Sequence, residues 1–313
     1  MSELHRPVLL QEAVDGLAVR PDGVYMDGTF GRGGHSRAIL ARLGDRGRLL
    51  GLDRDPQAYA AGQALAGTEM RFTMYRAAFS MLERIATEAG VSGRVDGVLL
   101  DIGVSSAQLD DPGRGFSFTQ AGPLDMRMDP EHGESAAAWL AHAGEQDIAH
   151  VLFTLGEERH ARRIAKAIVS ERATHPITDT LQLAEIVSRA APRHDRHKHP
   201  ATRSFQAIRI FINRELEELS ACLEQCLKVL APAGRLAVIS FHSLEDRIVK
   251  QFIRDHAGRV QGSRRGPPVA AKPAELAAVG KAQFASEAEL AANPRARSAV
   301  LRVAEKLSAA DRA

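Results

Sequence analysis

The sequence predicts an α/β protein, with a parallel sheet flanked by helices and interrupted by an inserted domain made only of helices. Three observations lead to this prediction. Short apolar runs alternate with amphipathic stretches between residues 24 and 101, which is the pattern of βαβ units. Between Asp101 and the next clear strand, which starts at Arg235, lie 133 residues, whereas a crossover between parallel strands needs only about a dozen or a few more. That interval contains helical patterns and no strand-like run.

The first half of the sheet is expected to have four short strands, each an apolar run bounded by turn residues. They are expected at residues 24–26, 47–53, 71–75 and 95–101. The second and fourth end in a carboxylate, at Asp53 and Asp101. Helices are expected between the strands, at 36–43 and 80–90.

The inserted domain is expected to consist of helices, because its apolar residues recur at helical spacing. The clearest patterns are "SAAAWLAHA", "QDIAHVLFTLG", "ARRIAKAIVSE" and "TLQLAEIVSRAA". The sheet then resumes with a crossover helix, a strand, a second helix and a final strand, expected at 205–230, 235–241, 244–256 and 298–306. The Gly/Pro/Ala-rich stretch 258–294 is expected to be a mobile loop. We therefore expect a first core segment at 1–105, the insert at 106–203 and a second core segment at 204–313.

Composition and targeting signals indicate a cytoplasmic protein. No apolar run approaches the roughly 20 residues that would span a membrane, and Val8–Leu10 is too short a core for a signal peptide. The two cysteines, Cys222 and Cys226, lie four apart in a helical pattern. We expect them to be two packed thiols rather than part of a disulfide framework.

Positive charge is concentrated in the middle of the chain. Residues 157–214 carry 12 Lys and Arg against 6 Asp and Glu, although the net charge of the whole chain is only +2. Such an excess indicates contact with a polyanion, and a solvated helix face is the alternative. The densest segment, "RHDRHKHPATR", offers phosphate contacts through Arg193, Arg196, Lys198 and Arg203. Its histidines (His194, His197 and His199) suggest zinc, but no cysteine or fourth ligand accompanies them, so no metal is expected.

The stretch "DGTFGRGGHS", residues 27–36, follows the first expected strand and places glycines where ligands bind at the carboxyl ends of parallel strands. A dinucleotide fingerprint starting at Gly31 would need a third glycine where Ser36 stands. S-adenosylmethionine fits better, because glycines let the backbone approach it and a helix N-terminus favours its carboxylate. Asp27 is placed to accept from the ammonium, directly or through water, and Asp53 from the ribose hydroxyls. The alternative is a tight turn with the acids as helix caps.

Several motifs together resemble the bacterial 16S rRNA cytosine-N4 methyltransferases, from about Pro7 to Glu305. They include "DGTFGRGGHS", "DGVLLDIGVSSAQLD", "HPATRSFQAIRIFIN" and "ISFHSLEDRIVK". The resemblance implies a Rossmann-like class I S-adenosylmethionine-dependent methyltransferase with an inserted all-helical domain. It also implies a substrate, a cytidine of the decoding centre near the P site of 16S rRNA in the small ribosomal subunit. The residues that it implies as cofactor contacts are Gly33, Gly34, His35, Asp53, Phe79, Asp101 and Gln108.

Cytosine N4 is a poor nucleophile because its lone pair is delocalised into the ring, so catalysis requires groups that accept its N–H bonds and let the lone pair re-form. The product ammonium then loses a proton to a carboxylate, a carbonyl or water. Many amino-methyltransferases use a D/N-P-P-aromatic stretch after the fourth strand, but here Asp101 is followed by "IGVSS". Asp101 is therefore the first catalytic candidate, with Ser105 and Ser106 nearby, and cofactor positioning alone is the alternative. His242 is the second candidate, with a structural role as its alternative.

Phe116 and Phe118 are candidates for stacking on a flipped cytosine, and plain core packing is the alternative role for these side chains. Three other functions are alternatives: a non-catalytic RNA-binding or ribosome-assembly protein on the same scaffold, a nicotinamide oxidoreductase, and an S-adenosylmethionine enzyme with another substrate. The sequence favours the rRNA methyltransferase. It leaves the oligomeric state open, with a homodimer as one option.

Overall fold

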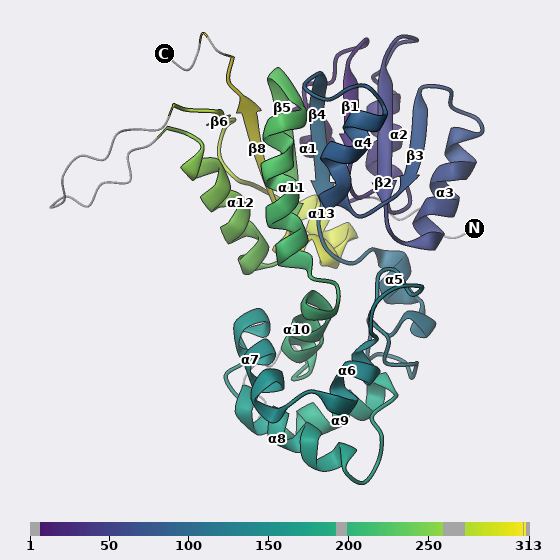
Figure 1. Ribbon diagram of the computed structural model, residues 1–313, viewed down its shortest axis with the longest axis vertical. Helices are drawn as coiled ribbons and strands as arrows, with labels where there is room; N and C mark the ends of the chain where they lie inside the picture. The colour runs from purple at the N-terminus through teal and green to yellow at the C-terminus, as the bar shows by residue number, and fades with distance from the viewer. Residues whose placement is uncertain (1–6, 192–198, 259–272, 309, 311–313) are drawn as a thin grey trace, which may run out of the picture. The chain divides into compact units, whose positions relative to one another are not determined.

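A computed structural model describes residues 7–191, 199–258, 273–308 and 310. The chain forms two compact units (Figure 1). Residues Met1–Gly103 and Leu216–Ala313 make a sheet unit, and residues Val104–Glu215 make a helical unit. The helical unit is thus inserted in sequence between two parts of the sheet unit.

The sheet unit contains a mixed sheet whose order is β3-β2-β1-β4-β5-β8-β6, with β7 also paired to β8. Strands β1 to β5 pair in parallel, and β8 runs antiparallel to β5, β6 and β7. The α/β class predicted from the sequence is therefore confirmed. The bounds of the strands are β1 Val24–Asp27, β2 Arg48–Asp53, β3 Phe72–Arg76, β4 Val95–Asp101, β5 Leu230–Ser240, β6 Leu276–Ala278, β7 Gln283–Phe284 and β8 Val300–Lys306.

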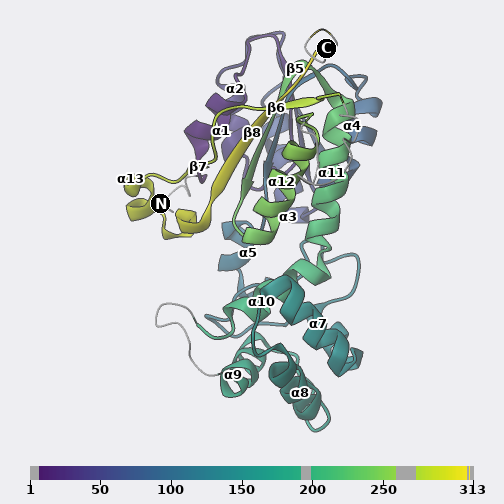
Figure 2. The same ribbon diagram turned by 90° about the vertical axis from the view of Figure 1, so that its left-hand side faces the viewer.

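Helices cover both faces of this sheet, as Figure 2 shows for α1 and α2 on one side and for α11 and α12 on the other. Two hydrophobic cores result, one on each face. Because helices cover both faces of the sheet, the sequence of β4 is an almost continuous apolar run and does not alternate between apolar and polar residues. The helices of this unit are α1 Leu10–Gly16, α2 Gly34–Leu40, α3 Pro56–Ala66, α4 Leu82–Glu88, α11 Glu215–Val229, α12 Ser243–Asp255 and α13 Glu287–Ala292.

The helical unit has its own hydrophobic core, built around Trp139, Leu152, Ile164 and Ile208. Apart from the short helix at Ser106–Asp110, each of its helices buries one apolar stripe, as the 3.6-residue periodicity of the sequence predicts. Their bounds are α5 Ser106–Asp110, α6 Ala136–His142, α7 Glu145–Gly156, α8 Ala161–Arg172, α9 Thr180–Ala190 and α10 Thr202–Ile212.

The single helix expected over 205–230 is wrong, because the structure has two helices there. Helix α10 ends with Asn213 as its C-cap, and Arg214 then adopts a left-handed φ of 50° before α11 begins. The Asn213 side chain bonds the backbone of Met126 and Met128, which fixes the break. Consequently α10 belongs to the helical unit, and the boundary expected at 203 falls inside this helix rather than at the observed division after Glu215.

The mobile loop expected over 258–294 is also partly wrong. Residues 259–272 lie outside the described residues, but the remainder contains β6, β7 and α13. The edge strands form by pairing with β8, a tertiary contact that a Gly/Pro/Ala-rich composition does not reveal.

Two further expectations concern the membrane and the cysteines. Among the described residues, we find no helix with the length and apolarity required to cross a bilayer. Cys222 and Cys226 are buried in α11 as free thiols, which confirms the expectation that they form no disulfide.

Candidate active site

Three carboxylates end three neighbouring parallel strands of the sheet unit. Asp27 ends β1, Asp53 ends β2 and Asp101 ends β4, and β1 lies between the other two. The carboxyl ends of parallel strands are where open α/β sheets bind ligands. This edge therefore carries the candidate site.

The glycine loop after β1 is shaped by its own packing. Gly33 caps α2 with a left-handed φ of 73°, and a Cβ there would lie 2.5 Å from Cζ of Phe30. A Cβ on Gly34 would lie 2.1 Å from Cγ of Pro7. The glycines thus let this loop close over Phe30 and Pro7, and the predicted contact of Gly33 and Gly34 with a cofactor stays a prediction.

The carboxylate of Asp27 accepts hydrogen bonds from the glycine loop and from α2. It is 1% exposed, accepts a 2.6 Å hydrogen bond from the Ser36 hydroxyl, and accepts a second, of 3.1 Å, from the Thr29 amide. Burial raises the pKa of Asp27 to about 6. Because Asp27 is covered and bonded in this way, it ties β1 to α2, and its acceptance from a ligand ammonium, directly or through water, stays a prediction.

Asp53 lies beside the same loop and is more open. Its Oδ2 accepts from the Gly31 amide at 2.8 Å, and its Oδ1 accepts from the Asp55 amide at 2.9 Å. Burial raises the pKa of Asp53 to about 6, while the two amide hydrogen bonds act in the opposite direction. Each carboxylate oxygen can accept a second hydrogen bond, so the predicted role of Asp53 with the ribose hydroxyls remains compatible with the site. Phe79, which follows β3, lies next to Gly28 at the end of β1.

Asp101 has the strongest electrostatic perturbation at this edge. Its Oδ1 is buried and has no hydrogen-bond partner among the described residues. Burial, and then the charges of Asp27 and Glu245, raise the pKa of Asp101 to about 8. In the free protein at neutral pH, the Asp101 carboxyl group is therefore mainly protonated.

His35 faces this carboxyl group. Its Nε2 lies 3.2 Å from the carbonyl oxygen of Val8, and a carbonyl only accepts, so Nε2 carries the ring hydrogen. Burial lowers the pKa of His35 to about 4, so the ring is neutral and Nδ1 presents a lone pair. This Nδ1 lies 3.6 Å from Oδ2 of Asp101. Two facing acceptors repel each other, which gives a second reason for a proton to reside on Asp101.

Glu245 is a member of this acidic group that the sequence analysis missed. It is 0% exposed, and its Oε2 accepts from the amides of Phe241 and His242, at 3.0 and 3.1 Å. The signal was present in "HSLE", a capping-box spacing, but its relevance to Asp101 depends on β4 and β5 being neighbours. His242 is the N-cap residue of α12, at the carboxyl end of β5, and its catalytic role stays a prediction.

Other candidates lie in the helical unit and have structural partners there. Gln108 completes a capping box, with its Oε1 2.8 Å from the amide of Ser105, the N-cap of α5. Phe116 is buried in the core of this unit. Phe118 contacts Phe205 edge-on, with ring centroids 4.8 Å apart. Packing accounts for both aromatic rings, and base stacking stays a prediction.

Most of the predicted phosphate contacts lie outside the described residues, namely Arg193, Arg196 and Lys198, together with His194 and His197 of the histidine group. Arg203 is exposed and donates to the carbonyl of Glu157 at 3.2 Å, close to the end of α7. His199 bonds the Ala201 amide at the start of α10 through Nδ1. These two side chains thus have local roles in the helical unit.

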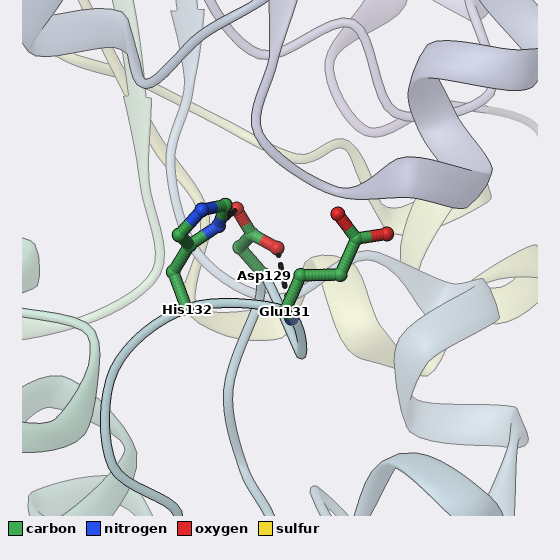
Figure 3. A group of neighbouring side chains, drawn as sticks. All are labelled: Asp129, Glu131 and His132. Atoms are coloured by element: carbon green, nitrogen blue, oxygen red, sulfur yellow. Dashed lines mark hydrogen bonds and ion pairs between the residues drawn. The ribbon is translucent and has the colours of Figure 1, made fainter.

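One group of side chains could offer ligand atoms to a metal ion. Asp129, Glu131 and His132 share a loop of the helical unit (Figure 3), and one donor atom from each lies within 4.8 Å of the others. His132 Nδ1 lies 2.9 Å from Asp129 Oδ2. Glu131 and His132 are exposed, so the group has the features of a solvated loop turn, and we assign it no metal.

The residues at the sheet edge fit S-adenosylmethionine by charge. This cofactor carries an ammonium and a sulfonium, and the edge offers an acidic group that includes a buried carboxyl oxygen, Oδ1 of Asp101, with no hydrogen-bond partner among the described residues. Such an oxygen is the feature expected where a ligand donor completes the site. All of the residues in this acidic group belong to the sheet unit.

Comparisons with known proteins found similar sequences over nearly the whole chain. Residues 2–307 match the model of the MraW methylase family. The chain is 62% identical over 309 residues to ribosomal RNA small subunit methyltransferase H of Thioalkalivibrio sulfidiphilus, covering 97% of this chain and 98% of that protein. It is 58% identical to the protein of the same name from Alcanivorax borkumensis, covering 97% of both. A solved putative rRNA-methylase from Clostridium thermocellum is 12% identical, with a TM-score of 0.44, over 97% of this chain and all of that one. The chain therefore belongs to the MraW methylase family, and it is an S-adenosylmethionine-dependent methyltransferase, as the sequence predicts.

Proposed function

We propose that this chain methylates the exocyclic N4 amine of a cytidine in the 16S rRNA of the small ribosomal subunit, in the P-site region of the decoding centre. The names of its relatives support the small-subunit rRNA as the substrate. The single structural observation that carries the proposal is the unpartnered, buried oxygen of Asp101 within an acidic group at the carboxyl edge of the sheet. That environment suits a cationic methyl donor and a group that must accept a proton.

S-adenosylmethionine, when bound, supplies an electrophilic methyl group on a cationic sulfur. The chain has two tasks in the proposed reaction. The glycine loop and Asp53 hold the donor, and Asp101 accepts a hydrogen bond from the N4 amine so that its lone pair is available for attack. As the new C–N bond forms and the C–S bond breaks, one N4 proton passes to the Asp101 carboxylate.

In this proposal, the positive charge of the bound methyl donor causes the Asp101 carboxyl group to ionise. In the free protein the carboxyl group is mainly protonated, because its pKa is raised to about 8. A cation nearby favours the carboxylate and lowers that pKa. The same residue therefore becomes able to accept a proton when the cationic donor is present.

The test is methyl transfer from labelled S-adenosylmethionine to small subunits that lack the modification, followed by nucleoside analysis. The wild-type chain is expected to yield N4-methylcytidine. Asp101→Asn is expected to slow transfer by roughly a hundredfold or more, because the amide cannot take up the proton. Asp45→Asn, at an exposed position before β2, is the matched control and is expected to retain the wild-type rate.

The outcomes separate the parts of the proposal. Another methylated nucleoside would refute cytosine N4 as the target. A wild-type rate for Asp101→Asn would remove Asp101 as the acceptor. No transfer by the wild-type chain, despite tight cofactor binding, would favour the non-catalytic assembly protein.

A further inference from the structure

Exposed cations follow one face of α8 in the helical unit. Arg162, Arg163 and Lys166 are exposed in its first two turns, and Arg159 is exposed just before the helix. At about 100° per residue, the three helical positions fall within an arc of roughly 100°. The buried residues of α8 occupy the opposite side, at Ala161, Ile164, Ala165 and Ile168. We call the four cations the α8 basic row.

No described residue neutralises the row. In the part of the helical unit that the structure describes, none of the four side chains forms an ion pair or a hydrogen bond. The other end of α8 differs, because Glu171 there forms an ion pair with Arg189 at 3.2 Å. The unpaired charges are therefore specific to the start of the helix.

The row also opposes the stability of its own helix. Like charges three and four residues apart repel by about 0.2–0.5 kcal/mol per pair. The amino end of a helix carries partial positive charge, which favours acids rather than bases, yet the first turn of α8 contains no acidic residue. Neither intrahelical electrostatics nor pairing within the described chain accounts for these cations, but an external anion would.

We propose that the α8 basic row binds the phosphate backbone of the RNA substrate. Guanidinium groups present a donor fork that matches phosphate oxygens, and contacts of this kind position a protein on RNA without reading its sequence. This inference rests on the proposed function, since it takes ribosomal RNA as the partner. It assigns to α8 a role that the sequence analysis gave to Arg193, Arg196, Lys198 and Arg203.

The test measures binding of the full chain to an in vitro transcript of small-subunit rRNA over a range of KCl concentrations. The variant is Arg162→Gln/Lys166→Gln. The control is Arg46→Gln/Arg48→Gln, which removes two exposed cations at the amino end of β2, away from the carboxyl edge. Loss of two phosphate contacts is expected to weaken binding about tenfold and to reduce the slope of log K against log [KCl] by about 1.5. The control is expected to leave the affinity within about twofold of the wild type and the slope unchanged.

Equal affinity and slope for the variant and the control would overturn the proposal. Normal binding of the variant to the transcript, with a loss only on assembled subunits, would also overturn it, because the row would then contact a ribosomal protein. Unfolding midpoints within about 2 °C of the wild type, the shift of a fraction of a kcal/mol, would confirm that both variants fold. Methyl transfer does not enter this measurement, so a chain that binds RNA through α8 but methylates nothing would refute only the proposed reaction.

Discussion

The carboxyl group of Asp101 lies in surroundings that disfavour its charge. It is near Asp27 and Glu245, and it faces the lone pair of a neutral His35 ring at 3.6 Å. Sequence reasoning found Asp101 because it follows an apolar strand directly. It could not find Glu245 or the orientation of His35, because these depend on neighbouring strands and on the carbonyl of Val8.

This environment predicts a pH dependence of folding stability. The pKa of Asp101 is raised from 3.8 to about 8, so the folded state binds this proton more tightly than the unfolded state. Its contribution is therefore fully present below about pH 4 and is lost as the pH rises toward 8. Asp101→Asn cannot ionise, and we expect it to be more stable than the wild type at pH 8, by an amount that shrinks as the pH falls. For one group, the slope cannot exceed about 1.4 kcal/mol per pH unit.

Urea unfolding between pH 6 and 8.5 measures this effect. His35 adds a pH dependence of its own near pH 6, because its pKa is lowered to about 4 in the folded protein while the unfolded ring still binds a proton there. Both proteins contain His35, so this contribution cancels in the difference between their stability curves. Parallel stability curves for the wild type and Asp101→Asn would show that Asp101 ionises normally in the folded protein.

At the scale of elements, the turn from β1 into α2 shows what a local signal can and cannot predict. The glycine cluster indicated close backbone approach, and the structure contains such an approach. The contacts that require it, however, are with Phe30 and Pro7, whose proximity was not evident from spacing. In the same way, the break between α10 and α11 depends on Asn213 bonding a loop more than 80 residues earlier in the chain. The helical periodicity of the sequence continues across this break and therefore does not reveal it.

The turn gives a matched pair of glycine substitutions. Gly33→Ala and Gly31→Ala both place a side chain at positive φ, at 73° and 56°, which costs about 1–2 kcal/mol. Only Gly33→Ala also places its Cβ 2.5 Å from Phe30, whereas the Cβ at Gly31 meets nothing closer than 3.9 Å. We expect Gly33→Ala to lower the free energy of unfolding by at least about 1 kcal/mol more than Gly31→Ala. Equal losses, measured by urea titration, would mean that Phe30 moves away freely.

At the scale of the whole molecule, the chain consists of two units with separate cores. The existence of an all-helical insert could be predicted from the sequence, because 133 residues without a strand cannot serve as one crossover. Its end could not be predicted, since the helical pattern continues from α10 into α11. A buried ion pair, Arg209 to Glu215, with N–O distances of 2.8 and 2.9 Å, lies at this end of the helical unit.

Because the two units have separate cores, we expect the loss of the Arg209–Glu215 ion pair to destabilise the helical unit and to leave the sheet unit unchanged. Glu215→Gln leaves the Arg209 charge buried without its counter-ion, which costs about 3–5 kcal/mol. We expect native-state hydrogen exchange to show reduced protection in α7 to α10, while protection in β1, β4 and β5 is retained. Glu224→Gln, at an exposed position of α11, is the control and should change neither set. Equal loss of protection in both units would instead show that they unfold together.

The insertion between β4 and β5 also fixes the order in which the protein is synthesised. Val98 of β4 pairs with Leu236 of β5, so its partner leaves the ribosome only after the entire helical unit has been made. Helical contacts are local in sequence and form quickly, whereas distant strand pairs form slowly. The nascent chain therefore carries a finished helical unit while one edge of β4 still lacks its neighbour. That apolar edge stays open to wrong partners until β5, which ends at Ser240, has been translated.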